Sequence, residues 1–238
     1  NQIINYQIDS YRKIRNTLRF LLGNLNNFNK HNLVIPEEMP ELERYLLTRI
    51  SNLNKKLKEL VSKHDYHAIY TALLNFCTLE LSAFYFDIRK DSLYCDDIKS
   101  IKRRSTSTCL HIIFEFLTKW LSPIVSFTCE EAWKSRSYSN EESILLQNVK
   151  DDEFTFKDIS LEKVFEELKR VRKSVTSALE LKRNEKLIGS SLQAKVILFL
   201  SKDTQKIIAD LDLAEMCIVS NVETHDISNR SKEAISIE

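Results

Sequence analysis

Apolar positions recur at spacings of three and four through most of this chain, which is the pattern of amphipathic helices. The first such stretch runs from Ile3 to Phe28, and its apolar stripe is Ile14, Leu18, Leu21, Leu22, Leu25 and Phe28. A helix is therefore expected over 3–28. Gly23 lies inside it at a cost of roughly 1 kcal/mol relative to alanine, so we expect a bend or a close helix contact there.

The same spacing predicts further long helices over 41–62, 66–89, 98–121 and 161–186. A loop with two prolines, over 29–40, separates the first two helices. Asp65 is a suitable N-cap for the helix over 66–89, whose wide apolar arc favours a central place in a bundle. Residues 90–97 are polar and are expected to form the corner before the next helix.

The remaining segments are shorter. Thr128 and Glu131 match the capping-box pattern at the start of a short helix that Trp133 anchors. The polar stretch over 135–157 is expected to be irregular, with a short extended clip formed by Glu141-Glu142 and the apolar residues 144–146. Beyond Gly189 the pattern changes to a strand over 194–200, a short helix over 202–210 and a second strand over 216–222.

These elements predict a mainly α protein, in which a helix bundle occupies residues 1–158. Residues 159–238 are expected to form a long amphipathic helix with a small α+β subdomain. The chain has only 2 glycines and 3 prolines among 238 residues. Because β-rich folds need many tight turns, this scarcity favours long helices.

Charge, cysteine content and hydropathy limit the kinds of function that this sequence can have. The net charge is +1, from 35 basic and 34 acidic residues, so a nucleic-acid surface requires that the basic residues gather on one side. The five cysteines form no CxxC pair, which argues against a zinc site. They are well separated and odd in number, which fits reduced thiols of a cytoplasmic protein. No apolar run approaches the roughly 20 residues of a membrane span. The chain has neither a signal peptide nor an initiator methionine, and is expected to be a piece of a longer protein.

The sequence offers no catalytic site and no metal site. Two glycines cannot build a phosphate-binding loop. His64 and His67 are the only histidines close enough to suggest a ligand pair, but they straddle an expected helix break. The acidic pairs Glu130-Glu131 and Asp151-Asp152 are more simply explained as caps and solvated surface.

Basic side chains are the remaining signal. Arg12, Arg15 and Arg19 lie on one stripe of the first helix, with Asp9 as their nearest acid, and three guanidiniums in a row suit a row of phosphates. A second group is Lys90, Arg103 and Arg104, expected at the turn between the third and fourth helices. The competing interpretation is a solvated face with intrahelical ion pairs. Three aromatic residues are candidate platforms for unpaired bases: Phe28, Tyr94 and Trp133.

Several segments resemble the isoleucyl-tRNA synthetases, which are class I enzymes, in order and spacing. They are YRKIRNTLRFLLGNLNNF (11–28), LSAFYFDIRKDSLYCD (81–96), RRSTSTCLHIIFEFLTKWLSPIVSFTCEEAW (103–133) and VRKSVTSALELKRNEKLIGSSLQAKVIL (171–198). The second and third segments also resemble the valyl and leucyl enzymes, whereas FLLGNLN and IGSSLQAKV favour the isoleucyl member.

The resemblance implies the helical domain that follows the catalytic core and grips the anticodon stem-loop of tRNA(Ile). The parent enzyme joins isoleucine to tRNA(Ile) with ATP and Mg²⁺ through an aminoacyl-adenylate. Its catalytic and editing domains are expected upstream, because neither the HIGH-like nor the KMSKS-like signature occurs here. Family members of bacterial type often end in a zinc module held by cysteines, and this sequence has no such cysteine pair. Two alternatives stay open: a helical bundle that binds proteins, and the equivalent domain of a valyl or leucyl enzyme.

Overall fold

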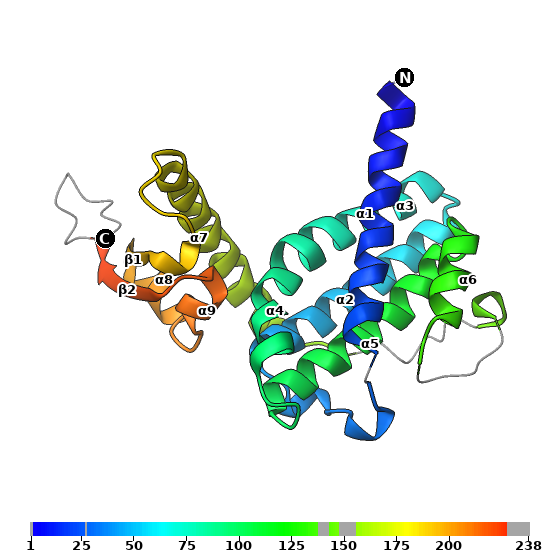
Figure 1. Cartoon of the computed structure of the whole chain (residues 1–238), viewed down its shortest axis with the longest axis horizontal. Coiled ribbons are helices and arrows are strands. Elements are labelled where there is room, and N and C mark those ends of the chain that lie inside the picture. The colour runs from blue at the N-terminus through cyan, green and yellow to red at the C-terminus, as the bar shows by residue number, and fades with distance from the viewer. Residues whose placement is uncertain (1, 27, 138–142, 148–155, 228–238) are drawn as a thin grey trace. The chain divides into compact units, whose positions relative to one another are not determined.

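The computed structural model describes residues 2–26, 28–137, 143–147 and 156–227. The chain divides into two compact units, residues 1–158 (unit 1) and residues 159–238 (unit 2). Unit 1 is a helix bundle and unit 2 combines helices with two short strands (Figure 1). The predicted fold class is therefore confirmed.

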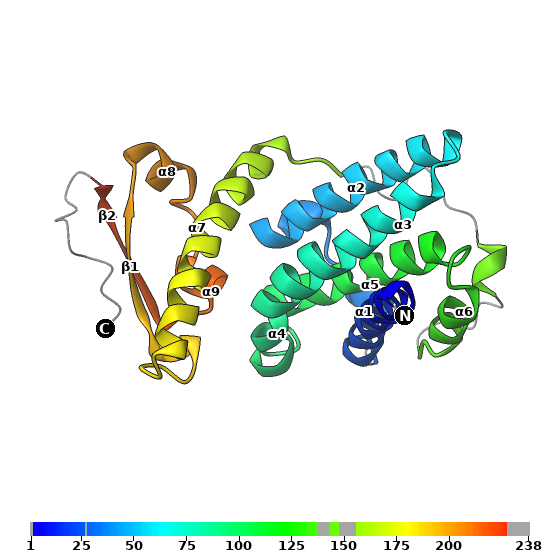
Figure 2. The ribbon, with the colours of Figure 1, turned by 90° about the horizontal axis from the view of Figure 1, so that it is seen from above.

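Unit 1 is built from long helices joined by short turns. Its α-helical elements are α1 (Gln2–Asn24), α2 (Glu41–Ser62), α3 (Tyr66–Asn75), α4 (Phe86–Cys95), α5 (Ile101–Leu121) and α6 (Ser126–Lys134). The first turns of α1 are exposed and stand clear of the bundle (Figure 1). Figure 2, which looks nearly along α1, shows α2 and α3 side by side. The expected proline loop contains two 3-10 turns, η1 (Lys30–Asn32) and η2 (Pro36–Glu38).

The junction between α2 and α3 forms as the sequence predicts. The helix α2 has the expected bounds, and His64 ends it with a left-handed φ of 55°. The Asp65 side chain then accepts a hydrogen bond from the Ala68 backbone N–H at 3.0 Å. This N-cap satisfies one of the free amides at the start of α3.

The third helix is longer than predicted. It continues from α3 through the π-helical segment η3 (Phe76–Tyr85) into α4 and ends at Cys95. Within η3 the Ser82 hydroxyl donates to the Cys77 carbonyl five residues back, at 2.9 Å. The expected corner over 90–97 is therefore helical up to Cys95, because Ser92 and Leu93 keep one face of α4 buried.

Among the described residues, the continuous helix Tyr66–Cys95 is long and apolar enough to cross a membrane by length and composition alone. Half of its most apolar window is buried within the protein, and the helix contacts α1, α2 and α5. A core helix of a bundle meets the same criterion, so its apolar character is explained by packing.

The core of unit 1 lies where these helices meet. Every long helix contributes fully buried apolar side chains: Ile14, Leu21, Leu42, Ile50, Leu57, Leu73, Leu81, Leu110, Phe114 and Leu117. Each such side chain stabilises the fold by about 1.5–3 kcal/mol relative to exposure. Trp133 is also buried and stacks on Phe114, with ring centroids 6.4 Å apart. Four of the five cysteines are buried, and all five are free thiols.

Three short-range predictions in unit 1 are wrong. The helix predicted from residue 98 begins three residues later, at Ile101, as α5. It begins there because the Ser100 hydroxyl accepts a hydrogen bond from the Arg103 backbone N–H, 3.2 Å away. The helix α6 begins at Ser126, so Thr128 lies inside it and forms no capping box. The segment η4 (Ile144–Leu146) is a 3-10 turn rather than an extended clip, and the expected partner residues 141–142 lie outside the described residues.

Unit 2 pairs a long helix with a parallel two-stranded sheet. Its elements are α7 (Ile159–Asn184), η5 (Ser191–Gln193), β1 (Lys195–Leu200), α8 (Lys202–Ile207), α9 (Leu213–Cys217) and β2 (Asn221–Asp226). In the sheet Lys195 is paired with Asn221 and Leu200 with Asp226. The helix α7 contacts α8 and α9 through a buried apolar stripe.

The second strand lies five residues beyond its predicted start. The run predicted as a strand from Met216 instead completes α9, whose N-terminus is capped by Asp212 through the Glu215 backbone N–H at 3.0 Å. Ile218 then adopts a left-handed φ of 57° and ends the helix. Met216 and Cys217 are apolar because they are buried in a helix, which a short apolar run alone cannot distinguish from a strand.

Candidate nucleic-acid interface

The structure places the three arginines of α1 in two different settings. Arg12 is 70% exposed and its guanidinium lies 3.5 Å from the Asp9 carboxylate, one turn away. Arg15 and Arg19 are exposed side chains that line a hollow between α1 and α6. Among the described residues, neither of these two guanidiniums has a hydrogen-bond or ion-pair partner. Two of the three predicted arginines are therefore available to an anion.

The α1–α6 hollow has a volume of about 520 Å³, within the range of small-molecule sites. Its polar wall consists of Arg15, Arg19, Asn26, Thr128, Glu131 and Ser135. A hydrogen bond of 2.9 Å between the Tyr11 and Thr128 hydroxyls ties the start of α6 to α1. Buried Leu18 and Ala132 also line the hollow, so rigid elements carry the charged side chains around it.

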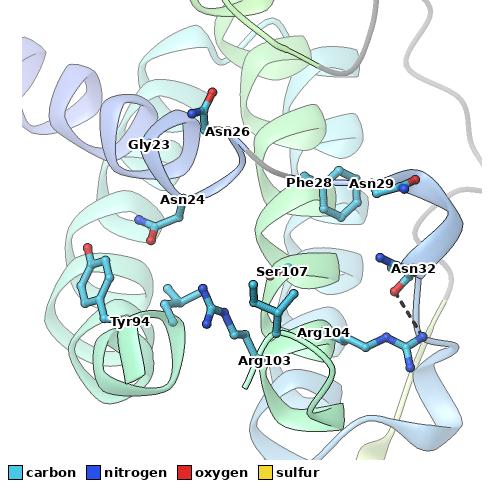
Figure 3. A pocket seen from close by; sticks show the side chains of 12 residues that line it. Gly23, Asn24, Asn26, Phe28, Asn29, Asn32, Tyr94, Arg103, Arg104 and Ser107 are labelled. Atoms are coloured by element: carbon cyan, nitrogen blue, oxygen red, sulfur yellow. Dashed lines mark hydrogen bonds between the residues drawn. The ribbon is translucent and has the colours of Figure 1, made fainter. Parts of the chain in front are cut away.

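A second hollow lies on the other side of the end of α1. This α1–α5 hollow measures about 240 Å³ and is rich in amides and guanidiniums: Asn24, Asn26, Asn29, Asn32, Arg103 and Arg104. In Figure 3, Tyr94 and Asn24 lie on one side and Phe28, Asn32 and Arg104 on the other, with Arg103 between them. The residues come from α1, the loop after it, α4 and α5.

Arg103 and Arg104 are half-buried, and backbone carbonyls already hold part of each guanidinium. Arg103 Nη1 donates to the Asp96 carbonyl at 2.5 Å, and Arg104 Nη2 donates to the Asn32 carbonyl at 3.4 Å (Figure 3). Within the described part of the chain, the buried Nε of Arg104 has no hydrogen-bond partner. Because each guanidinium has five N–H donors, both retain donors for a ligand in the hollow.

The two hollows share part of their wall. Gly23 and Asn26 line both, so four arginines from two helices surround the C-terminal end of α1. A Cβ atom built on Gly23 would meet no atom of the described residues within 4 Å, apart from its own helix backbone and chain neighbours. The close helix contact predicted at this glycine is therefore wrong, and α1 instead ends one residue later, at Asn24.

Lys90 is separated from the arginines with which it was grouped. It lies on α4 rather than at a turn, and its Nζ is 3.2 Å from the Asp87 carboxylate. Lys90 and Arg12 line neither hollow. The neighbouring Arg89 is fully buried. Of the basic pair Arg89-Lys90, the first residue therefore belongs to the core and the second lies in solvent.

The three candidate aromatic platforms differ in how far they are open to a base. Tyr94 is 65% exposed and lies at the α1–α5 hollow. Phe28 stacks on His111 with ring centroids 4.6 Å apart, which occupies one of its faces. Trp133 is only 1% exposed and is covered by the Arg136 guanidinium, 3.3 Å above its ring. Trp133 is therefore a core residue.

Among the described residues, no three histidine, cysteine or carboxylate side chains are grouped so that they could hold a metal ion. His64 Nδ1 instead lies 3.4 Å from the Tyr66 hydroxyl, in an exposed position. Burial raises the pKa of the Cys77 thiol to about 12, which leaves it protonated and unreactive at neutral pH.

Sequence reasoning missed the asparagines and Glu131. The amides follow one another in the segment GNLNNFNKHN, and this density after a helix was the available signal. Glu131 was interpreted as a cap or solvated surface, because no local pattern brings α6 against α1. The two helices meet across more than a hundred residues of sequence, and a hydrogen bond between the Tyr11 and Thr128 hydroxyls joins them.

Comparison with known proteins gives a family match and several similar proteins. Residues 43–198 match the family described as the anticodon-binding domain of tRNA ligase. The chain is 46% identical over 94% of its length to an isoleucine–tRNA ligase of Pelagibacter ubique. It is 42% and 39% identical, over 92% and 94% of its length, to those of Agrobacterium fabrum and Bradyrhizobium diazoefficiens.

The chain spans about a quarter of the length of these relatives, covering 25%, 23% and 23% of them. The family match covers more than half of the chain and includes α5 and α6, which carry Arg103, Arg104 and Glu131. The helical fold of unit 1 agrees with this match. This chain belongs to the family of anticodon-binding domains of tRNA ligases.

Proposed function

We propose that this chain is the anticodon-binding part of an isoleucine–tRNA ligase and that unit 1 holds the anticodon stem-loop of tRNA(Ile). The isoleucine assignment is supported by relatives of that name, which match more than nine-tenths of the chain. The location of the binding site is supported by one structural observation. Arg15 and Arg19 line one hollow, Arg103 and Arg104 line the next, and the two hollows share Gly23 and Asn26.

The physical basis is the neutralisation of phosphates. Guanidiniums form charge-assisted, often bidentate, hydrogen bonds with phosphate oxygens. Arg15 and Arg19 are four residues apart on a rigid helix, so they lie on the same side about 6 Å apart along the axis. The amide-lined α1–α5 hollow suits an unstacked base, and exposed Tyr94 offers it a stacking surface. Arg12 and Lys90 remain as weaker, peripheral cations.

The chemistry of the parent ligase is assigned to other parts of the protein. In this proposal the whole enzyme acts in the cytoplasm and joins isoleucine to tRNA(Ile) with ATP and Mg²⁺. Its catalytic and editing domains are the chain's covalent partners, and any zinc module lies outside this chain. The residues described here bind and orient the tRNA, and they contribute no reacting group.

Binding of the purified chain to a tRNA(Ile) transcript across a salt series tests the proposal. Four phosphates neutralised by the four arginines predict a log–log slope of about −2.8 to −3.6, at roughly −0.7 to −0.9 per phosphate. A tRNA for a different amino acid should bind more weakly at the same salt concentration. Absence of binding at low ionic strength, or a slope near zero, would overturn the proposal.

A further inference from the structure

The α1–α6 hollow contains a carboxylate that a phosphate site does not need. Glu131 lines the hollow together with Arg15 and Arg19. Among the described residues, the Glu131 carboxylate has no hydrogen-bond or ion-pair partner. It lowers the charge of the three side chains from +2 to +1 and repels any phosphate nearby. A ligand that uses the whole hollow must therefore offer N–H donors as well as an anion.

The adjacent Glu130 shows that the two carboxylates have different roles. The Glu130 carboxylate lies 2.9 Å from Lys134 Nζ and accepts hydrogen bonds from the Ser143 hydroxyl and the Ile144 backbone N–H. These contacts, with the Lys134 hydrogen bond first, lower the pKa of Glu130. Glu130 fixes η4 to α6. Glu131, one residue on, lines the α1–α6 hollow and makes no such side-chain contact among the described residues.

A nucleotide combines an anion with N–H donors, and the four bases differ in what they offer a carboxylate. Guanine presents two adjacent donors on its Watson–Crick edge, N1–H and the N2 amino group, which match the two oxygens of a carboxylate. Adenine and cytosine place a ring nitrogen acceptor beside their amino group, and that acceptor repels the second oxygen. Uracil has one N–H between two carbonyl oxygens. Unstacked bases in RNA loops are read on these edges.

We propose that the α1–α6 hollow takes one unstacked guanine of the bound RNA. Glu131 accepts hydrogen bonds from its N1–H and N2 amino group, while Arg15 and Arg19 hold the adjoining sugar–phosphate backbone. This inference rests on the proposed function, since it requires that an RNA loop reach this end of the bundle. Glu131 is then a specificity-determining residue, and its two acceptor oxygens are what distinguish guanine from the other bases.

The test uses the whole chain and a set of RNA hairpins, each with one loop guanine at a different position, together with matched hairpins in which inosine replaces that guanine. Inosine lacks only the N2 amino group. Fluorescence anisotropy at one salt concentration should show, at one loop position, about tenfold tighter binding of guanine than of inosine. Glu131→Gln should reduce this ratio to less than twofold, because an amide has one acceptor and opposes the other N–H with its own donors.

Glu130→Gln is the matched control, and it should keep the guanine preference even if it lowers the melting temperature. Equal binding of guanine and inosine hairpins at every position, or an unchanged preference in Glu131→Gln, would overturn the inference. If the hairpins still bind, with a steep salt dependence that is lost when Arg15 and Arg19 are replaced, the proposed function stands although the guanine inference fails. If no hairpin binds at low salt, both fall.

Discussion

Arg89 and Glu43 form a two-fold hydrogen-bonded ion pair inside unit 1. Arg89 Nε lies 2.7 Å from Glu43 Oε1, and Arg89 Nη2 lies 2.8 Å from Oε2. Both side chains are buried, at 1% and 0% exposure. The hydroxyls of Tyr85 and Thr106 also donate to Oε1, at 3.1 and 3.3 Å. The pair therefore connects α2 to α4, η3 and α5. Burial, followed by the charge of Glu43, raises the pKa of Tyr85 well above its ordinary value.

Replacing Arg89 by methionine should destabilise the protein strongly, because it leaves the Glu43 carboxylate buried without its counter-charge. Breaking a buried pair from one side costs about 3–5 kcal/mol. The loss should be measured as the change in unfolding free energy in urea. The double replacement Arg89→Met with Glu43→Leu should recover most of it, since two apolar side chains leave no charge to solvate.

Lys90→Met supplies the control for this prediction. Lys90 is adjacent in sequence but exposed, and its pair with Asp87 lies at the surface. Surface substitutions of this kind change stability by about 0.5 kcal/mol or less. If Arg89→Met and Lys90→Met gave the same urea midpoint, the buried pair would not have the structural role described.

The double variant Arg15→Ala with Arg19→Ala should weaken tRNA binding while the helical circular dichroism and the melting temperature stay nearly unchanged. Both side chains are exposed and neither has a described partner, so their loss removes no contact of the fold. The salt dependence should become shallower by about 1.4–1.8 in log–log slope, for two phosphates no longer neutralised. Filter binding across a salt series measures both effects.

Lys55→Ala with Lys56→Ala removes the same charge from the exposed face of α2 and is the matched control. These lysines line neither hollow, so the slope should change much less. A comparable change in slope for both double variants would mean that net charge alone, and not the position of Arg15 and Arg19, governs binding.

Tyr94→Ala should weaken binding of an RNA hairpin about 5- to 150-fold, the equivalent of roughly 1–3 kcal/mol for one stacked base. Tyr94→Phe should retain most of the affinity, because the ring and not the hydroxyl stacks. Tyr66 is 65% exposed like Tyr94, but it lies at the start of α3 and away from the hollows. Tyr66→Ala should therefore bind like the unmodified chain, and an equal loss in both alanine variants would contradict the role of Tyr94.

Acid should destabilise the protein through His111. Burial, followed by the charges of Lys30, Arg136 and Lys119, lowers the pKa of His111 from its ordinary 6.5 to about 4. The folded state therefore resists a proton that the unfolded chain accepts. The free energy of unfolding is therefore highest above pH 6.5, where His111 is neutral in both states. It decreases progressively as the pH falls from 6.5 towards 4, because the unfolded chain gains a proton that the folded state does not. Between pH 7 and pH 5 the loss is on the order of 2 kcal/mol.

His111→Phe keeps an aromatic ring against Phe28 and cannot be protonated. Urea unfolding at pH 7 and pH 5 should show a smaller acid-induced loss in this variant than in the unmodified chain. His31→Asn, at an exposed position, should leave the acid sensitivity as it is. Equal acid sensitivity in His111→Phe and the unmodified chain would show that another group is responsible.

Much of the fold could be predicted because helix formation depends on near neighbours. The bounds of α2 follow from its apolar spacing together with Pro40 before it and Asp65 after it, and both ends agree with the structure. The centre of α7 and the strand β1 were found in the same way. The misplaced strand β2 marks the limit of this approach, since Met216 and Cys217 are equally apolar in a strand and in a buried helix.

The amino-acid sequence by itself determined the long helices, the apolar stripe of each, and which arginines are candidates for binding an anion. Only the tertiary structure decided which cations face a ligand: Arg89 is buried on Glu43, whereas Arg15 and Arg19 line a hollow opposite Glu131. The physical reason is distance along the chain. Apolar periodicity acts within a few residues, whereas the role of a charged side chain depends on partners that are distant in sequence. Glu43 lies 46 residues from Arg89, and Glu131 lies more than a hundred residues from Arg15.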